Sequence, residues 1–166
     1  MTMRVMLACL LIGLVSTAAT AKTFRWSSQG DAATHDPHAQ NEGVNNQING
    51  QIYEQLLSRD RNLKPVTSLA TAWKKVSPTV WVFTLRKGVT WQDGSAFTAD
   101  DVVFSVIRSQ HDASNMKVFG TAVGKPRRID DHTVEFTTPV PNPVLLDMLS
   151  AGNIFIMSKA WCVKHR

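Results

Sequence analysis

The chain has 166 residues, of which 43% are hydrophobic and 19% charged, a composition typical of a globular protein. The 18 Lys and Arg residues outnumber the 13 Asp and Glu residues and give a net charge of +5, but the basic residues are scattered and do not alternate with aromatic ones. The sequence therefore has no base-stacking pattern, and we expect no nucleic-acid partner.

Residues 1–21 have the pattern of a secretory signal peptide. Arg4 supplies positive charge, residues 5–15 form an apolar run, and small residues end the segment at Ala19-Thr20-Ala21. The run is shorter than the about 20 residues of a transmembrane helix, and no later segment approaches that length. We expect cleavage after Ala21 and a mature chain that begins at Lys22. Cys9 would leave with the signal, so Cys162 could form no internal disulfide; we expect it to be a buried thiol rather than a zinc ligand or a nucleophile.

The sequence of the mature chain predicts a mixture of strands and helices. A strand is expected at residues 23–29, and a helix at residues 44–57, where apolar residues recur every four positions. Two strands, at residues 69–76 and 79–86, should pair around Ser77-Pro78. Residues 111–126 are expected to be loose. Later elements are a hairpin of residues 127–130 and 133–137, a short helix capped by Asn142, and a strand at residues 153–157.

The most informative stretch spans residues 81–108. Trp81, Phe83 and Leu85 alternate with more polar residues, which is typical of a strand with one buried face. Asp93-Gly94 favours a turn, and Thr98 stands where a helix N-cap is expected. One apolar helical face follows, made of Ala99, Val102, Val103, Val106 and Ile107. Each of these residues is expected to be part of the scaffold.

Several short motifs occur in an order that resembles a known family. They are Asp36-Pro37, Ile52-Tyr53-Glu54-Gln55-Leu56, Leu69-Ala70 with Trp73, Trp81 to Arg86, Gly88-Val89, Asp93-Gly94, Thr98 to Val102, Phe104-Ser105, Ile129-Asp130 and Thr133 to Phe136. Together they resemble solute-binding protein family 5, the dipeptide-, oligopeptide- and nickel-binding proteins of ABC importers. The resemblance implies a mixed α/β (α+β) fold that forms the N-terminal part of a two-lobed periplasmic-binding-protein-like fold.

The resemblance also implies a division of the chain. Residues 22–43 would hold the first strand and loop of the hinge-proximal lobe, residues 44–157 the small α/β domain of that lobe, and residues 158–166 a truncated return segment. Family members are several times longer, so we expect an N-terminal fragment. The implied function is a periplasmic receptor without enzymatic activity or cofactor. It would be a monomer that binds a solute, with peptide expected ahead of nickel, sugar or opine, and that serves the membrane subunits of an ABC importer.

The family also implies which residues touch the ligand. The loop after the first strand would line the cleft, which gives Ser27, Ser28, Gln29, Gly30 and Asp31 as candidates, with an ordinary polar loop as the alternative. Phe119 stands where an aromatic residue can cover the ligand, with packing against the core or a loop as the alternative.

A second function class stays open, because His35 and His38 flank Asp36 and Pro37. His and Asp are ligands of transition metals, so a secreted metal-binding or hydrolytic protein could use this region. The spacing fits no standard metal site, and a turn around Pro37 explains the cluster as well. Asp130, Asp131 and His132 are assigned to a hairpin turn rather than to catalysis.

Overall fold

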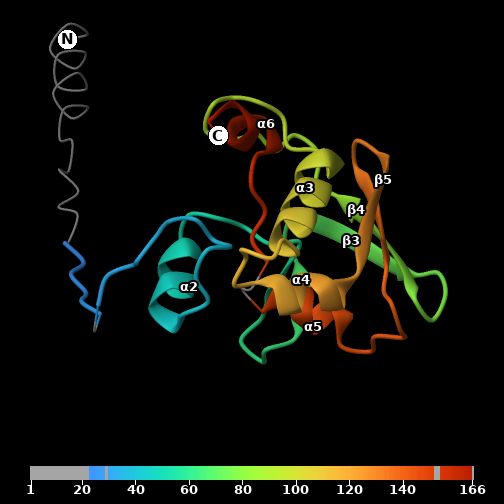
Figure 1. The fold of residues 1–166 in the computed structure, drawn as a ribbon, viewed down its shortest axis with the longest axis horizontal. Coiled ribbons are helices and arrows are strands. Elements are labelled where there is room, and N and C mark those ends of the chain that lie inside the picture. The colour runs from blue at the N-terminus through green and yellow to red at the C-terminus, as the bar shows by residue number, and fades with distance from the viewer. Residues whose placement is uncertain (1–22, 29, 152–153, 166) are drawn as a thin grey trace, which may run out of the picture.

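The computed structural model describes residues 23–28, 30–151 and 154–165 and confirms a mixed α/β fold (Figure 1). The predicted signal peptide lies outside the described residues. None of the helices in the described part combines the length and the hydrophobicity that crossing a bilayer requires. In chain order the elements are α2 (Gly43–Asn49), β1 (Leu57–Arg59), β2 (Pro65–Thr67), β3 (Ala70–Lys75), β4 (Val80–Leu85), α3 (Ala99–Ser109), α4 (Lys117–Val123), β5 (Lys125–Asp130), β6 (Thr133–Thr137), α5 (Leu145–Ser150) and α6 (Lys159–Lys164).

Four antiparallel strands form the main sheet in the order β3-β4-β6-β5. Phe83 of β4 lies opposite Trp73 of β3 on one side and Val134 of β6 on the other. The two predicted strand pairs are confirmed, and they are joined through β4 and β6. Strands β1 and β2 form a separate two-stranded sheet.

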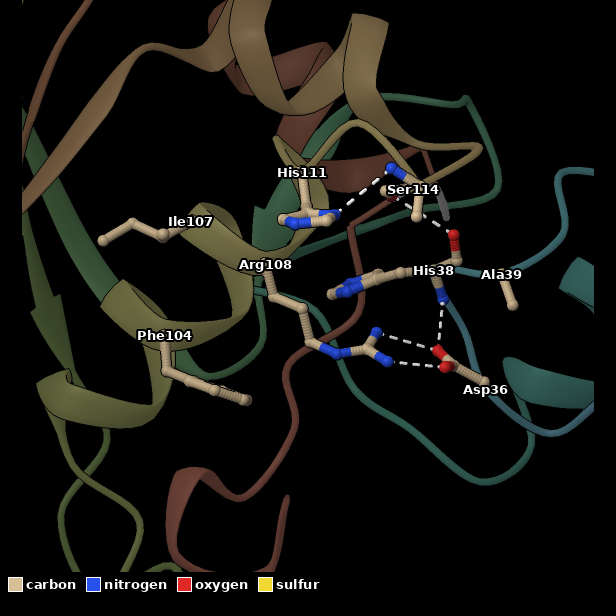
Figure 2. Close-up of a pocket in the computed structure, with 9 residues that line it drawn as sticks. Asp36, His38, Ala39, Phe104, Ile107, Arg108, His111 and Ser114 are labelled. Atoms are coloured by element: carbon tan, nitrogen blue, oxygen red, sulfur yellow. Dashed lines mark hydrogen bonds and ion pairs between the residues drawn. The ribbon is translucent and has the colours of Figure 1, made fainter. Parts of the chain in front are cut away.

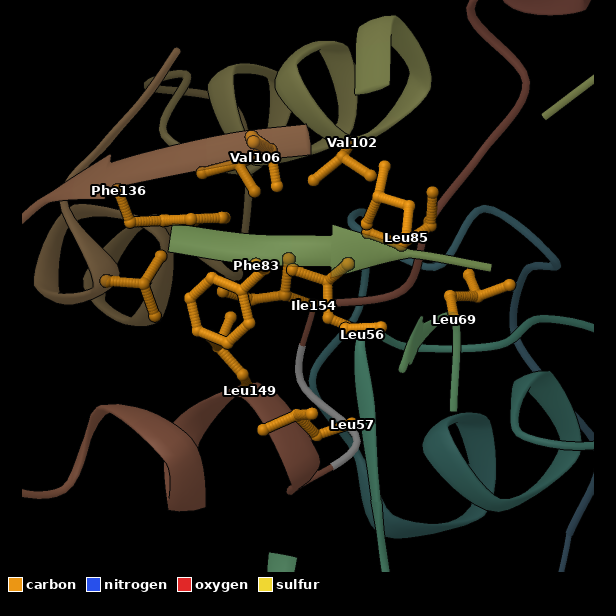
Figure 3. Packing of buried hydrophobic residues seen from close by; sticks show 14 of the residues in the cluster. Leu56, Leu57, Leu69, Phe83, Leu85, Val102, Val106, Phe136, Leu149 and Ile154 are labelled. Atoms are coloured by element: carbon orange, nitrogen blue, oxygen red, sulfur yellow. The ribbon is translucent and has the colours of Figure 1, made fainter. Parts of the chain in front are cut away.

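The main sheet buries one of its two faces. Along β4, Trp81, Phe83 and Leu85 are buried and alternate with Val80, Val82 and Thr84, which are more exposed. The buried side chains meet residues from α3, α4, α5 and β1 in one hydrophobic cluster (Figure 3). The period-2 pattern of the sequence therefore identified the core-facing side of this strand correctly.

Helix α3 begins after Thr98, as predicted. The Asp101 carboxylate accepts hydrogen bonds from the N–H of Thr98 at 2.9 Å and from the N–H of Lys159 at 2.8 Å. It also accepts from the Trp91 indole N–H at 3.3 Å. Because Asp101 is only 5% exposed, one buried side chain joins the start of α3 to the loop before it and to the start of α6.

The predicted first strand is wrong. Residues 23–28 have no strand partner among the described residues, and Phe24 and Trp26 are 85% and 61% exposed. The predicted helix at residues 44–57 is also too long, because α2 ends at Asn49 before Gly50. Its buried side chains are Asn45 and Asn49 rather than the apolar ones that suggested the helix.

Three further expectations need correction. The segment at residues 111–126 is not loose throughout, because it contains α4. Residues 154–157 are buried but belong to no strand; the N–H of Ile156 bonds the Glu54 carbonyl at 2.9 Å. Asn142 accepts a hydrogen bond from the N–H of Val144 at 3.1 Å and so shapes the turn that precedes α5.

Gly124 joins α4 to β5 at a place that excludes any side chain. Its φ is +87°, and a Cβ there would lie 2.7 Å from the Cα of Thr138. We expect Gly124→Ala to lower the free energy of unfolding by roughly 3 kcal/mol, since backbone strain and a clash with backbone add together. Gly94→Ala is the matched control, because Gly94 has a φ of +83° but open space around it, and should cost roughly 1 kcal/mol. Urea denaturation measures both, and equal losses would contradict the prediction.

Asp101→Ala should lower the free energy of unfolding by about 3 kcal/mol, because it leaves the N–H groups of Thr98, Lys159 and Trp91 without their acceptor. Asp100→Ala is the control, since Asp100 is half-buried and makes ion pairs with Arg128 and Lys159. That substitution should cost less than about 1 kcal/mol. A similar urea midpoint for both variants would show that Asp101 does not have the role described.

Candidate functional site

An irregular strap, residues 33–39, crosses the molecule beside α2 and the end of α3 (Figure 2). On one side, Asn45 of α2 accepts from the N–H of Ala33 and donates to the Thr34 carbonyl, both at 2.8 Å. On the other side, the His38 carbonyl accepts from the N–H of Asn115 at 3.0 Å. The strap contains no helix or strand, so hydrogen bonds to side chains and to backbone groups of neighbouring segments hold it in place.

Asp36 and Arg108 form the charged centre of this region. The two terminal nitrogens of the Arg108 guanidinium donate to the two Asp36 carboxylate oxygens at 2.8 and 2.5 Å. The N–H of His38 donates to the same carboxylate at 3.0 Å. Burial alone would raise the pKa of Asp36, but the hydrogen bonds and charge of Arg108 and the N–H of His38 leave it below its ordinary value. The pair is therefore ionised at neutral pH.

His38 is the most deeply buried polar residue of the strap, with 1% of its surface exposed. Its Nε2 lies 3.2 Å from the Phe155 carbonyl oxygen. A carbonyl can only accept, so Nε2 carries the proton and Nδ1, which has no partner, is unprotonated. Burial, followed by the positive charge of Arg108, lowers the pKa of His38 to about 4. The ring is therefore neutral at pH 7.

A pocket of about 490 Å³ lies between the strap and α3. Figure 2 shows that α3 contributes the apolar Phe104 and Ile107 as well as the charged Arg108, and that the strap contributes Asp36 and His38. Its lining residues are Asp36, His38, Ala39, Phe104, Ile107, Arg108, His111, Ala113 and Ser114. A pocket with apolar walls and a few fixed polar groups is suited to a small organic solute rather than to a bare ion.

Two further pockets near α6 are lined in part by Tyr53, and one of them shares residues with the first pocket. One of about 470 Å³ also includes Asp36 and Arg108, and one of about 550 Å³ is lined by Trp91 and Trp161. Tyr53 and Cys162 line both. Cys162 is partly exposed there rather than buried as predicted, and it forms no disulfide with any of the described residues.

The structure does not bring the predicted ligand-binding residues together. Ser27, Ser28, Gly30 and Asp31 lie on exposed chain before the strap, and Gln29 lies outside the described residues. Phe119 belongs to α4 and packs, partly buried, against the hydrophobic core. Figure 1 shows α2 between the early segment and α4.

Sequence reasoning missed Arg108 and Tyr53. Arg108 was only the last residue of the stretch assigned to the scaffold, and Tyr53 was assigned to an overlong helix. Both side chains contact the strap, since the Tyr53 hydroxyl donates to the His35 carbonyl at 3.1 Å. One sequence signal could have indicated a residue such as Arg108. The Asp36 carboxylate lies in a Pro-containing turn, Asp36-Pro37, and needs a positively charged partner.

The metal-binding alternative gains no support. Within residues 23–28, 30–151 and 154–165, no three His, Cys, Asp or Glu side chains are placed to hold a metal ion. His38 is bonded to a backbone carbonyl and Asp36 to Arg108, so each already has another partner. His35 lies exposed on the strap.

Comparison with known proteins gives a consistent result. The family model "Bacterial extracellular solute-binding proteins, family 5 Middle" matches residues 64–163. The periplasmic oligopeptide-binding protein OppA of Escherichia coli K12 is 32% identical over 154 residues, which cover 80% of this chain and 28% of that protein. The dipeptide-binding protein of the same strain is 28% identical, covering 89% of this chain and 32% of its own length.

Solved structures agree with the fold. An oligopeptide ABC transporter substrate-binding domain from Bacillus anthracis superposes with a TM-score of 0.78 at 20% identity, covering 85% of this chain and 31% of that one. MoaA of A. tumefaciens R10, solved with mannopinic acid, gives a TM-score of 0.71 at 30% identity, and the match covers 81% of this chain and 29% of that one. The chain thus spans about three tenths of the length of these relatives.

Arg108→Ala should raise the pKa of Asp36, because the carboxyl keeps its burial and loses its guanidinium partner. Both side chains are about one-third exposed, so we expect a loss of only about 1 kcal/mol of stability near neutral pH. NMR titration of the Asp36 carboxyl and urea denaturation measure the two effects. The control is Arg128→Ala, whose partners Asp100 and Asp131 are elsewhere; a raised Asp36 pKa in that variant would contradict the assignment.

Proposed function

Since the chain belongs to the bacterial extracellular solute-binding proteins of family 5, we propose that it is part of a peptide receptor of an ABC importer. The family match over residues 64–163, together with 32% identity to an oligopeptide-binding protein, carries this proposal. Peptide is favoured as the solute because relatives named for oligopeptides, murein peptides and dipeptides all align with the chain. Such a receptor captures its solute by non-covalent contacts and has no need of a nucleophile or a cofactor.

The division of the chain follows from this proposal. Residues 22–43 would belong to the hinge-proximal lobe, residues 44–157 to its small α/β domain, and residues 158–166 to the return segment. The one-sided sheet and its helices lie within the second of these ranges, which supports that boundary. In a two-lobed receptor, closure of the lobes around the solute excludes water from the polar contacts.

Ser27, Ser28, Gln29, Gly30 and Asp31 remain the proposed ligand-contacting loop. The exposed position of its described members leaves their polar groups available to a solute. Phe119 is proposed as a cover for the ligand, although its packing against the core favours a structural role. The receptor would act as a monomer in the periplasm and deliver the solute to the membrane subunits of the importer.

Uptake by intact cells tests the proposed function. A strain that lacks the gene for this protein should take up labelled di- to pentapeptides more slowly than its parent, while uptake of free amino acids, the internal control, stays unchanged. Supplying the gene in trans should restore peptide uptake. Normal peptide uptake with impaired uptake of nickel, sugars or opines would reject peptide as the solute, and normal uptake of all four would reject the receptor assignment.

Export of the chain has its own test. We propose that signal peptidase cleaves after Ala21, because Ala19-Thr20-Ala21 presents small residues at the required positions. N-terminal sequencing of protein released from the periplasm should read from Lys22. Ala19→Arg should slow processing and leave the precursor with the membrane fraction, whereas Lys22→Gln should be processed normally. A mature protein that retains Met1 would contradict the assignment.

A further inference from the structure

The strap, residues 33–39, is fastened to the rest of the molecule mainly by polar contacts, and Pro37 and His38 are its buried residues. None of the described residues of the hydrophobic core cluster comes from the chain before Leu56. The fastening contacts reach α2 through Asn45, α3 through Arg108, and the chain before α4 through Asn115. A segment held in this way can detach without opening the core, since local opening follows the contacts that each segment makes.

Among the described hydrogen bonds of the strap, the one that the His38 ring makes is fully buried. The ring joins residue 38 to residue 155, which are 117 positions apart in sequence, through the Phe155 carbonyl. The ring is buried, and Nδ1 has no hydrogen-bond partner. A proton added at Nδ1 would become a buried donor with no acceptor, next to the positive charge of Arg108.

We propose that the strap is an acid-releasable latch: protonation of His38 detaches residues 33–39 from α3 and from residues 154–157, while the sheet and α3 remain folded. The inference does not depend on which solute the protein binds. It concerns the attachment of the exposed residues 23–28 and 30–31, which precede the strap in the sequence.

The charges around His38 oppose protonation of its ring while the strap is attached, so a proton on the ring favours detachment of the strap. Asp36 on the strap attracts the proton, but both Asp36 oxygens are already bonded to Arg108 of α3. His111, just after the end of α3, lines the same pocket. Neither α2 nor the described residues 154–157 contain a charged side chain. Of these charged groups, Arg108 therefore has the larger effect, and its positive charge opposes protonation of the His38 ring.

The direction of the pH dependence follows from linkage. When the strap is detached, the His38 ring has its ordinary pKa of 6.5. When the strap is attached, the pKa of the ring is about 4. Between these values the detached strap binds a proton that the attached strap does not. The strap is thus most firmly attached above pH 6.5. The equilibrium constant for its detachment rises by up to about tenfold for each pH unit below 6.5. Asp36 titrates below this window, because its pKa is lower than 3.8.

Hydrogen exchange followed by NMR on the whole chain tests the latch between pH 6.5 and 4. The reporters for the strap are the amides of His38 and Asn115, which bond Asp36 and the His38 carbonyl. The reporters for the sheet are the amides of Phe83 and Val134. After correction for the intrinsic pH dependence of exchange, strap protection should fall by about tenfold per pH unit while sheet protection stays constant.

His38→Gln is the decisive variant, since a glutamine amide can still donate to the Phe155 carbonyl but does not titrate. Its strap amides should show no fall in protection over this range, whereas His111→Gln should behave as the wild type. In the wild type itself, the His38 ring should titrate over the same pH range as the strap amides, a measurement that needs no variant. Constant strap protection, simultaneous loss in strap and sheet, or an unchanged response in His38→Gln would each overturn the proposal.

Discussion

Burial of a single face of the main sheet is the constraint on which the rest of the structure depends. Strand β4 lies inside the sheet, and its Trp81, Phe83 and Leu85 all turn to the same side. Every element that covers hydrophobic surface must therefore pack on that side, and α3, α4 and α5 all contribute to the one cluster there. The opposite face can carry Lys74, Glu135 and Arg127 in register across neighbouring strands.

Packing on this one face of the sheet also explains how residues 154–159 are held in place. This stretch is largely buried but pairs with no strand of the main sheet, so its backbone groups need other partners. Ser105 accepts from the N–H of Met157 at 2.8 Å, and Asp101 accepts from the N–H of Lys159. His38 donates to the Phe155 carbonyl. Side chains from α3 and from the strap thus replace the hydrogen bonds that a strand would have supplied.

The sequence predicted the parts of the fold in which local pattern and packing agree. The alternation at residues 81–85 and the turn at residues 131–132 placed β4 and the hairpin of β5 and β6 correctly. The helix expected at residues 44–57 failed because its apolar period did not coincide with burial: Asn45 and Asn49 face inward, while Ile52 is 48% exposed. The strand expected at residues 23–29 failed because alternation alone supplies no pairing partner.

The candidate site was harder to predict than the fold. Its central contacts, from Asp36 to Arg108 and from His38 to Phe155, join residues 72 and 117 positions apart in the sequence. Composition and periodicity describe neighbours along the chain, so they carry no information on such pairs. The residue types in the Asp36-Pro37-His38 motif were noticed, but their role in fastening a strap follows only from the positions of their distant partners.

The pairing of β4 with β6 has a consequence for how the chain folds. The β3–β4 and β5–β6 pairs are each local, with short connections at residues 76–79 and 131–132. Their union joins Thr84 to Thr133 and closes a long loop that contains α3 and α4. Because closing a long loop costs entropy before its contacts form, the two hairpins should form first, and their docking should limit the rate. Substitutions at the β4–β6 seam would then slow folding, whereas those at the hairpin turns would mainly shift the population of early structure.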